Sequence, residues 1–392
     1  MRLLVVFPSR LRGGAEEYAL SVGRAGKERG WDVHAAFPRT AMTESLVEDF
    51  SNAGIPHHPV SFREVAGSRV RMLARHALNL ERAIAILRQI RPDVVLANEP
   101  WPRALSELVV ACGMLGIPTA VVIHMAYGCD RIGRIQLRFR KWAQKRRQRY
   151  AAVSEGARAG LARLFEITPA AIARIDLGIR MDRAVMARPQ GAIREEVRQE
   201  LGLEPNARIV LTVGQLSPVK GHDLLVPVIS AVARDSPQLS FLWAGDGPAR
   251  EDLEAIVRRH DVAGRVVFLG NRTDVPRLLR GADLFVLPSR YESFGLAVLE
   301  AMAYGLPVVT SDGGSLPELV VHEEHGILFE SGNGGDLEAK VRWALRHPEE
   351  MRRLAANAQQ RAAEYSPERM NHETLEILES LCGGPGGSPV AS

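Results

Sequence analysis

Short apolar runs alternate with longer helical patterns along almost the whole chain, and this alternation constrains the fold more than any other feature. The runs of the first half are LLVVF at 3–7, VHAAF at 33–37, DVVLAN at 93–98, TAVVIH at 119–124 and YAAVS at 150–154. Strands separated by helices pair in parallel, with helices covering both faces of the sheet. The alternation therefore predicts a doubly wound α/β domain.

The same rhythm starts again after a stretch rich in Arg, Met and Pro around 181–191. The runs of the second half are IVLTVG at 209–214, LSFLWAG at 239–245, RVVFLG at 265–270, DLFVLPS at 283–289 and PVVTS at 307–311. A single hydrophobic core stops growing at roughly 250–300 residues. A chain of 392 residues with two such series is therefore expected to form two domains.

The domain boundaries follow from where these series begin and end. We expect an N-terminal Rossmann-like domain over 1–180, a linker over 181–190 and a C-terminal Rossmann-like domain over 191–365. The last helical pattern, 366–381, follows the strands of the second domain and is expected to cross back to the first. The tail, 382–392, is Gly, Pro and Ser without a hydrophobic period, so we expect it to be disordered.

Composition excludes several classes of protein. The chain is 46% hydrophobic and 24% charged, as in packed globular proteins. Its three cysteines have no paired spacing, which favours a reducing compartment and argues against a zinc site or a disulfide framework. The first apolar run, 3–7, is too short for a signal peptide, and none approaches the roughly 18–20 residues of a spanning helix. We therefore expect a cytoplasmic protein.

The loops after the apolar runs are expected to hold the chemistry, because open parallel sheets bind ligands at the carboxyl ends of their strands. The loop GQLSPVKG follows the run that ends at 213. In it, Gly214 permits a tight turn, Lys220 supplies a cation and Gly221 opens a helix whose amides can face an anion. A diphosphate suits such a loop, although a single lysine at this place is more often a solvated surface residue.

A more specific signal is PSRYESFGLAVLEAMAYGLPVVTSDGGSLPEL at 288–319, in which seven residues separate Glu292 from Glu300. Glu300 falls in a predicted helix over 296–303, and Glu292 lies in the loop before it. Amides at the start of that helix can meet phosphate oxygens, while the two carboxylates accept hydrogen bonds from sugar hydroxyls. The alternative for Glu300 is an exposed helix residue paired with a neighbouring cation.

Taken in order, the motifs of this chain resemble those of the family 4 glycosyltransferases, which have the GT-B fold. The matching segments are RGGAEEYAL at 12–20, IHMAYG at 123–128, AVSEGARAGL at 152–161, AGDGP at 244–248, the Glu292 to Glu300 block, GGSLPEL at 313–319 and GILFESG at 326–332. The resemblance extends from Met1 to about Leu381. It implies two Rossmann-like domains that face each other across a cleft.

The resemblance also implies a role for each matching residue. Lys220 would bind the donor diphosphate, Glu300 the ribose and Glu292 the transferred sugar, and Lys220, Glu292 and His124 would be the catalytic residues. Gly13, Gly14 and His124 would lie on the acceptor side. The other donor-binding residues would be Gly14, Gly214, Gln215, Gly245, Asn271, Arg272, Thr273, Phe294, Gly295 and Leu296.

The chain departs from the family pattern at two places. Gln215 stands where the family usually has an arginine, so one of two cations on the diphosphate is missing, and Arg12 or Arg290 are candidates to replace it. The usual Asn-Gly-hydrophobic-Asp turn near the domain junction reads LGIR at 177–180, and we assign that turn no binding role. His124, taken alone, is more often a structural histidine at a strand end, and only the resemblance favours a place beside the sugar.

The reaction implied by the resemblance is transfer of a hexose-type sugar from a nucleotide diphosphate donor with retention of configuration. No cofactor or metal is expected, and UDP is the commonest donor nucleotide of the family. Retaining glycosidases use a carboxylate nucleophile opposite the leaving group, and the resemblance implies no second acid on that face here. We therefore expect the leaving phosphate to take the proton of the acceptor hydroxyl. The acceptor is expected to be a glycan, a lipid-linked sugar or a small molecule.

Residues 131–149 hold nine Lys and Arg and no acid, in a chain with a net charge of +4. Ile132, Ile135, Phe139 and Trp142 recur there at helical spacing, beside a cationic stripe. The basic segment either lies on an anionic membrane surface or packs on the domain core with solvated cations, and the two readings weigh equally. No nucleic-acid-binding motif accompanies the charge. The cationic stripe consists of Arg131, Arg134, Arg138, Lys141, Lys145 and Arg149.

Three other functions are compatible with parts of the pattern. A sugar-nucleotide epimerase on the same fold would lack the Glu292 to Glu300 block, and glycogen or starch synthases are longer. A non-catalytic sugar-nucleotide-binding protein is suggested only by Gln215. A dinucleotide dehydrogenase is excluded because PSRLRGGAEE at 8–17 lacks the G-x-G-x-x-G spacing.

Overall fold

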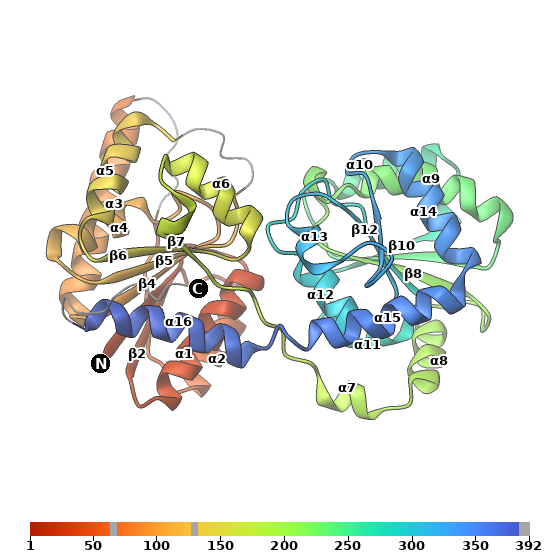
Figure 1. Cartoon of the computed structure of the whole chain (residues 1–392), viewed down its shortest axis with the longest axis horizontal. Coiled ribbons are helices and arrows are strands. Elements are labelled where there is room, and N and C mark those ends of the chain that lie inside the picture. Colours follow the sequence, from red (N-terminus) through yellow and green to blue (C-terminus); the bar gives the residue numbers. More distant parts are fainter. Residues whose placement is uncertain (63–68, 127–131, 384–392) are drawn as a thin grey trace. The chain divides into compact units, whose positions relative to one another are not determined.

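The computed structural model describes residues 1–62, 69–126 and 132–383 and divides the chain into two compact units (Figure 1). Unit 1 consists of Met1–Gly178 together with Pro367–Ser392, and unit 2 of Ile179–Ser366. The expected linker, 181–190, falls within unit 2. It contains the short helix α7 (Arg183–Ala187) and the first residue of α8 (Gln190–Glu200).

Unit 1 is built on a seven-stranded sheet in the order β3-β2-β1-β4-β5-β6-β7, with all neighbours parallel. The strands are β1 (Arg2–Val6), β2 (Asp32–Phe37), β3 (His57–Pro59), β4 (Val94–Glu99), β5 (Thr119–Ile123), β6 (Gln148–Ala152) and β7 (Ile172–Arg174). The apolar runs of the first half predicted five of them. The outermost two, β3 and β7, have three residues each and carry no apolar run.

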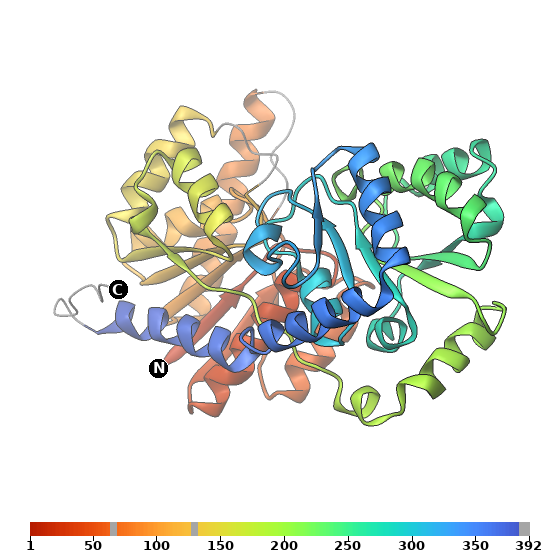
Figure 2. The same cartoon turned by 45° about the vertical axis from the view of Figure 1, so that its right-hand side comes forward.

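Seven helices of unit 1 lie in the described ranges and cover this sheet. They are α1 (Gly14–Glu28), α2 (Glu44–Asn52), α3 (Arg69–Ile90), α4 (Ser106–Leu115), α5 (Arg134–Gln144), α6 (Glu155–Phe165) and α16 (Pro367–Cys382). Helix α16 packs against α1, β4 and β5, and both views show it running along unit 1 (Figure 1, Figure 2). The hydroxyl groups of Tyr18 and Thr374 join it to α1 at 2.8 Å. Cys382 ends this helix, so the first residue of the expected disordered tail is helical, and 384–392 lie outside the described residues.

Unit 2 holds a second parallel sheet, in the order β10-β9-β8-β11-β12-β13. Its strands are β8 (Arg208–Val213), β9 (Leu239–Ala244), β10 (Val266–Gly270), β11 (Leu284–Leu287), β12 (Val308–Ser311) and β13 (Ile327–Phe329). Its other helices are α9 (His222–Asp235), α10 (Arg250–Arg259), α11 (Val275–Gly281), α12 (Leu296–Ala303), α13 (Leu316–Leu319), α14 (Gly334–Arg346) and α15 (Pro348–Ala362).

Both units therefore have the doubly wound architecture predicted from the sequence, and the strand interiors form their cores. Strand β4 is buried along its whole length, and Trp243 on β9 is among the largest fully buried side chains. Each sheet has one place where the strand order reverses, between β1 and β4 in unit 1 and between β8 and β11 in unit 2. Such switch points are where open parallel sheets bind ligands. Within the described ranges, no helix is both long and apolar enough to cross a bilayer.

Candidate functional site

The switch point of unit 2 brings Lys220 and Glu292 together. Lys220 lies in the loop after β8, and Glu292 in the loop after β11, the neighbouring strand. The Nζ atom of Lys220 donates to the Oε1 atom of Glu292 at 2.6 Å, and the hydroxyl group of Ser289 donates to the same oxygen at 2.7 Å. One carboxylate oxygen is thus shared by a cation and a hydroxyl group, at the edge of the sheet where a ligand is expected.

Arg290 holds these two loops together. Its amide donates to the carbonyl of Val219 at 2.7 Å, and its guanidinium group binds both carboxylate oxygens of Asp223 at 2.8 and 2.6 Å. The guanidinium group lowers the pKa of Asp223. Ser289, Arg290 and Asp223 were not assigned these roles from the sequence, because the contact depends on β8 and β11 being neighbours. Their only sequence signal is that all three are polar residues in or next to loops that follow apolar runs.

The two arginines that were candidates to replace the missing cation are both already paired. Arg290 is bound to Asp223, and Arg12 in unit 1 forms ion pairs with Glu17 and Asp49, each at 2.6 Å. Gln215 itself is exposed. In the described part of the unit 2 switch point, Lys220 is therefore the cation that contacts Glu292.

Two glycines permit close backbone contacts around this site. Gly245 has φ +138°, and a Cβ atom there would lie 2.0 Å from the carbonyl oxygen of Gly214. Gly314 has φ +70°, and a Cβ atom there would lie 2.1 Å from the carbonyl oxygen of Glu292. Both positions combine a left-handed conformation with contact distances that no side chain allows. They explain why the AGDGP and GGSLPEL segments carry glycine at these places.

Glu300 lies on α12, whose bounds agree with the helix predicted over 296–303. Burial of its carboxyl group raises the pKa of Glu300 to about 7. Gly295 is the N-cap of this helix, and its carbonyl accepts from the amides of Val298 and Leu299, each at 3.0 Å. The first two amides of the helix, those of Leu296 and Ala297, have no acceptor within it. Phe294 is buried and its ring packs edge-on against Tyr365, with centroids 5.8 Å apart.

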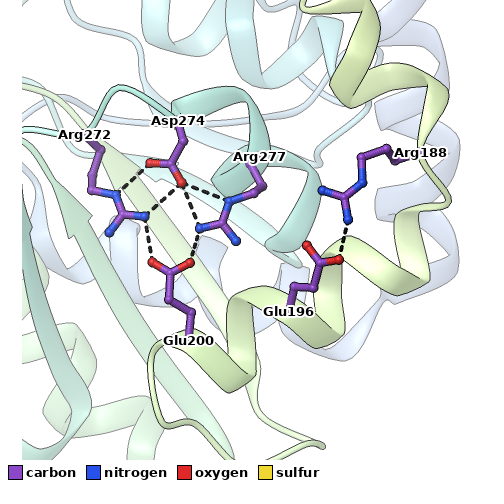
Figure 3. Close-up of polar contacts among 6 residues, drawn as sticks. All are labelled: Arg188, Glu196, Glu200, Arg272, Asp274 and Arg277. Atoms are coloured by element: carbon purple, nitrogen blue, oxygen red, sulfur yellow. Dashed lines mark hydrogen bonds and ion pairs between the residues drawn. The ribbon is translucent and has the colours of Figure 1, made fainter.

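The turn after β10 is anchored by a cluster of four charged side chains (Figure 3). Arg272 donates to Asp274 at 2.7 and 2.8 Å and to Glu200 at 2.8 Å, and Arg277 binds the same two carboxylates. The hydrogen bonds from Arg272 lower the pKa of Asp274 to about 2. The side chain of Arg272 is therefore occupied within this cluster, whereas Asn271 and Thr273 are exposed.

His124 follows β5 in unit 1 and is held by Asn98, the next-to-last residue of β4. Its Nε2 atom lies 2.6 Å from the Oδ1 atom of Asn98, whose amide nitrogen donates to the carbonyl of Ala15 at 2.8 Å. Because the Oδ1 atom can only accept, Nε2 carries the proton and Nδ1 has the lone pair. Burial lowers the pKa of His124 to about 3, so the ring is neutral at physiological pH.

The basic segment is only partly helical. Helix α5 ends at Gln144, and Arg149 lies on β6, so the expectation that Arg149 belongs to the cationic stripe is wrong. The helical period continues past 144 in the sequence, but Gln148–Ala152 pairs with β5 instead. Lys141 is bound to Glu166 at 2.7 Å, while Arg134, Arg138 and Lys145 are exposed. Arg131 lies outside the described residues.

One arginine of this segment is buried. Arg140 is 3% exposed and its Nη2 atom donates to both carboxylate oxygens of Glu99, at 2.8 and 3.0 Å. The apolar stripe of the segment is divided in the same way. Phe139 is 51% exposed, whereas the ring of Trp142 is partly buried beneath the guanidinium group of Arg146.

Two family models match the chain. The model of Glycosyltransferase Family 4 matches residues 12–183, and that of Glycosyl transferases group 1 matches residues 193–361. The lipopolysaccharide core biosynthesis mannosyltransferase LpsB of Rhizobium meliloti is 37% identical over 170 residues, which are 42% of this chain and 48% of that protein. The alpha-D-kanosaminyltransferase of Streptomyces kanamyceticus is 29% identical over 256 residues, which are 62% and 66%. The chain thus spans between about half and two thirds of the length of these relatives.

Solved structures match nearly the whole chain. A glycosyltransferase from Rickettsia africae ESF-5 superposes with a TM-score of 0.82 at 17% identity, over 98% of this chain and 99% of that one. Anabaena Alr3699/HepE in complex with UDP-glucose superposes with a TM-score of 0.80 at 23% identity, over 97% and 100%. These likenesses confirm the GT-B fold that the motifs implied.

Proposed function

The chain belongs to the family 4 glycosyltransferases, and from this premise we propose that it moves a hexose-type sugar from a nucleoside diphosphate to an acceptor hydroxyl with retention of configuration. The observation that carries the proposal is the ion pair of Lys220 and Glu292 at the switch point of unit 2. An ammonium group suits a diphosphate, and a carboxylate suits a sugar hydroxyl. UDP is the proposed nucleotide, supported by the Anabaena protein that was crystallised with UDP-glucose.

The proposed reaction needs the charge on the departing diphosphate to be balanced. Lys220 supplies one positive charge, and the amides of Leu296 and Ala297 at the start of α12 supply partial charges without moving. The bond between the anomeric carbon and the phosphate oxygen breaks while the acceptor oxygen bonds to the same face. The acceptor proton passes to the leaving phosphate. No cofactor or metal ion takes part in the reaction as we propose it.

The remaining residues bind and orient the donor in this proposal. Glu300 accepts hydrogen bonds from the ribose hydroxyls, and Glu292 from the transferred sugar once Lys220 has turned to the diphosphate. His124 contacts the sugar through the lone pair on Nδ1, as an acceptor of a hydroxyl hydrogen bond and not as an acid, because its ring is neutral. The acceptor is a glycan, a lipid-linked sugar or a small molecule.

We also propose that the protein is cytoplasmic and attaches to an anionic membrane surface through α5. Phe139, Arg134, Arg138 and Lys145 are the exposed members of the basic segment that support attachment. Each cation near such a surface contributes about 1 kcal/mol. Sedimentation with vesicles that contain anionic lipid should decrease when Arg134 and Arg138 are replaced by Gln. Equal sedimentation of the variant and the wild type would contradict attachment through this helix.

The proposed transfer is tested by incubating the protein with UDP-glucose, UDP-galactose, UDP-N-acetylglucosamine and GDP-mannose, with and without EDTA. We expect slow donor hydrolysis with at least one of them, unchanged by EDTA, and NMR of the released sugar should first show the anomer of the donor. Nucleotide binding without any turnover would favour the non-catalytic alternative. A sugar released first as the opposite anomer would contradict retention.

A further inference from the structure

The turn after β10 carries two exposed polar residues on either side of an anchored one. Asn271 and Thr273 are exposed, whereas the side chain of Arg272 points into the cluster of charged side chains in Figure 3. The edge of a nucleobase carries hydrogen-bond donors and acceptors, and backbone groups and small polar side chains are the partners that match them. The turn therefore presents two such side chains to solvent, while Arg272 fixes it to the rest of unit 2.

This turn lies on the same edge of the sheet as Lys220. Strands β8, β9 and β10 are neighbours, and their ends are joined by backbone hydrogen bonds. The amide of Gly214 donates to the carbonyl of Ala244 at 2.9 Å. The amide of Gly245 donates to the carbonyl of Gly270 at 2.8 Å. Two strand spacings separate β8 from β10, which is on the order of 10 Å. In the proposed reaction, the nucleoside of a donor whose diphosphate binds Lys220 therefore lies within reach of the turn.

Helix α8 supplies the acid that closes the cluster. Glu200, its last residue, accepts from Arg272 at 2.8 Å through Oε1 and from Arg277 through Oε2. Asp274 accepts from the same two arginines, at 2.7 and 2.8 Å from Arg272 and at 2.9 Å from Arg277. Each guanidinium group thus binds both carboxylates (Figure 3). The hydrogen bonds from Arg272 and Arg277 lower the pKa of Glu200, so its carboxylate stays ionised at neutral pH.

The cluster contributes more to the orientation of Arg272 than to stability. Its four side chains are between 18% and 39% exposed, and ion pairs in such contact with water add little to the free energy of unfolding. A guanidinium group that binds two carboxylates is nevertheless held in one orientation, because its hydrogen bonds follow fixed N–H directions. Asp274 is only two residues from Arg272, so Glu200 is the acid that ties the turn to a different helix.

The end of α8 is itself fixed within unit 2. Helices α8 and α11 pack against each other. Arg198, two residues before Glu200, is buried and donates to the carbonyl of Gly281 at 3.2 Å and to the carboxylate of Asp283 at 2.8 Å. Gly281 ends α11, and Asp283 directly precedes β11, a central strand of the sheet. Glu200 therefore holds Arg272 from a helix end that is anchored to the middle of the sheet.

We infer that Glu200 is a positioning residue for the nucleoside of the donor: by holding Arg272, it keeps the turn over 271–273 in the conformation that binds the base. The inference rests on the proposed function, because it takes the ligand of unit 2 to be a nucleoside diphosphate. A turn that is fixed before the ligand arrives lowers the cost of binding. Without the carboxylate of Glu200, affinity for the nucleoside falls and uracil and guanine are discriminated less well, whereas the diphosphate still binds Lys220.

Binding is measured on the full chain by calorimetry, with UDP, GDP and inorganic pyrophosphate as probes. Glu200→Gln keeps the size of the side chain, but its NH2 group replaces an oxygen that one of the two arginines needs as an acceptor. We expect Glu200→Gln to bind UDP at least about fivefold more weakly than the wild type and to bind pyrophosphate equally well. The ratio of the UDP and GDP affinities should move toward one. In donor hydrolysis or transfer, KM for the donor should rise by the same factor while kcat changes by less than about twofold.

Glu196→Gln is the matched control. Glu196 lies one turn earlier on α8 and forms an ion pair with Arg188 instead (Figure 3). Its side chain is 45% exposed, against 39% for Glu200, so the two acids are equally accessible to water. Replacing Glu196 should leave the three affinities, KM and kcat unchanged. If the acids of α8 served only to stabilise the helix, the two variants would behave alike.

An unchanged UDP affinity in Glu200→Gln would overturn the inference, and so would a loss of UDP affinity matched by pyrophosphate or by Glu196→Gln. A fall in kcat at constant KM would do the same, because it would place the effect of Glu200 in the chemical step. UDP binding with the expected losses but without any turnover would sustain the inference and contradict the proposed transfer. A wild type that binds no nucleoside diphosphate would overturn both.

Discussion

The ammonium group of Lys220 lies 2.6 Å from a carboxylate oxygen of Glu292, so the two groups assigned to the diphosphate and to the sugar are paired with each other. In the proposed reaction, a diphosphate that enters the site competes with Glu292 for Lys220. Once the lysine turns to the phosphates, the carboxylate oxygen it leaves is available to a sugar hydroxyl. In the proposed reaction, nucleotide binding and the binding of a sugar hydroxyl by Glu292 are thereby coupled through one hydrogen bond.

Replacing Lys220 by Met should lower the rate of donor hydrolysis or transfer by about 100-fold or more, because it removes a charge that stabilises the leaving group. The variant also leaves the Glu292 carboxylate to repel the diphosphate. UDP should therefore bind more weakly to Lys220→Met than to the double variant Lys220→Met/Glu292→Gln. Lys27→Met, at an exposed lysine of α1, serves as the control and should change neither quantity. Equal UDP affinities of the single and double variants would rule out the proposed competition.

The raised pKa of Glu300 makes the stability of the ligand-free protein depend on pH. The pKa of Glu300 in the folded state, about 7, lies above the ordinary pKa of a glutamate, 4.5, so the folded state retains a proton that the unfolded state has released. The contribution of Glu300 to the free energy of unfolding is fully present below pH 4.5 and is lost as pH rises through 7. Between pH 5 and pH 8 the wild type should therefore lose about 3 kcal/mol of its free energy of unfolding through this group. Glu300→Gln has no carboxyl group at this place and should not show that loss. Urea unfolding at the two pH values measures the difference.

Glu300 should also link nucleotide binding to protons. If the ribose hydroxyls bind the ionised carboxylate, binding releases a proton near pH 6.5, and the enthalpy measured by calorimetry changes with the ionisation enthalpy of the buffer. Glu300→Gln should abolish this dependence and weaken UDP. Proton release that persists unchanged in the variant would assign it to another group.

His124 should make the protein sensitive to acid. Its pKa in the folded state, about 3, lies below the ordinary pKa of a histidine, 6.5, so on acidification the unfolded state takes up a proton before the folded state does. Stability from the neutral ring is present above pH 6.5 and declines as pH falls toward 3. His124→Gln removes this titration, and its loss of stability from pH 7 to pH 4 should be about 3 kcal/mol smaller than that of the wild type. Parallel curves would contradict a buried neutral imidazole.

Removing Arg140 alone should lower the free energy of unfolding more than removing it together with Glu99. Arg140→Met leaves the buried carboxylate of Glu99 without a counter-charge, which typically costs about 3–5 kcal/mol. The double variant Arg140→Met/Glu99→Gln should recover part of that loss, because no charge remains buried. Denaturant unfolding measures both. The carboxylate of Glu99 also accepts from the amides of Arg103 and Leu105, each at 3.2 Å. A double variant less stable than Arg140→Met would show that Glu99 acts mainly through these two hydrogen bonds.

The sequence predicted those parts of the fold that depend on local pattern. The central strands carry long apolar runs because both faces of a parallel sheet are covered, and helix α12 was predicted from the helical stretch over 296–303. The sequence did not predict the short outer strands β3 and β7. Their residues, HHP and IAR, form no apolar run, and each strand is formed by pairing with one neighbouring strand. The cationic stripe was predicted to reach Arg149 because the helical period of the sequence continues that far. In the structure Arg149 belongs to β6, which pairs with β5.

The sequence predicted single residues of the site but not the contacts between them. Lys220 and Glu292 were named from their loops, but the ion pair depends on β8 and β11 being adjacent, which spacing along the chain does not specify. The same holds for Arg290, which the sequence offered as a spare cation and which the structure pairs with Asp223.

The return of α16 makes unit 2 an insertion within unit 1. A fragment that stops at Gly178 would lack the helix that supplies Leu375 and Leu378 to the buried interior, and exposed apolar surface of that kind favours aggregation. Anyone who wishes to produce unit 1 separately should instead splice Pro367–Cys382 onto Gly178 through a flexible Gly-Ser bridge. Unit 2, by contrast, is one uninterrupted stretch of polypeptide and can be excised with two cuts.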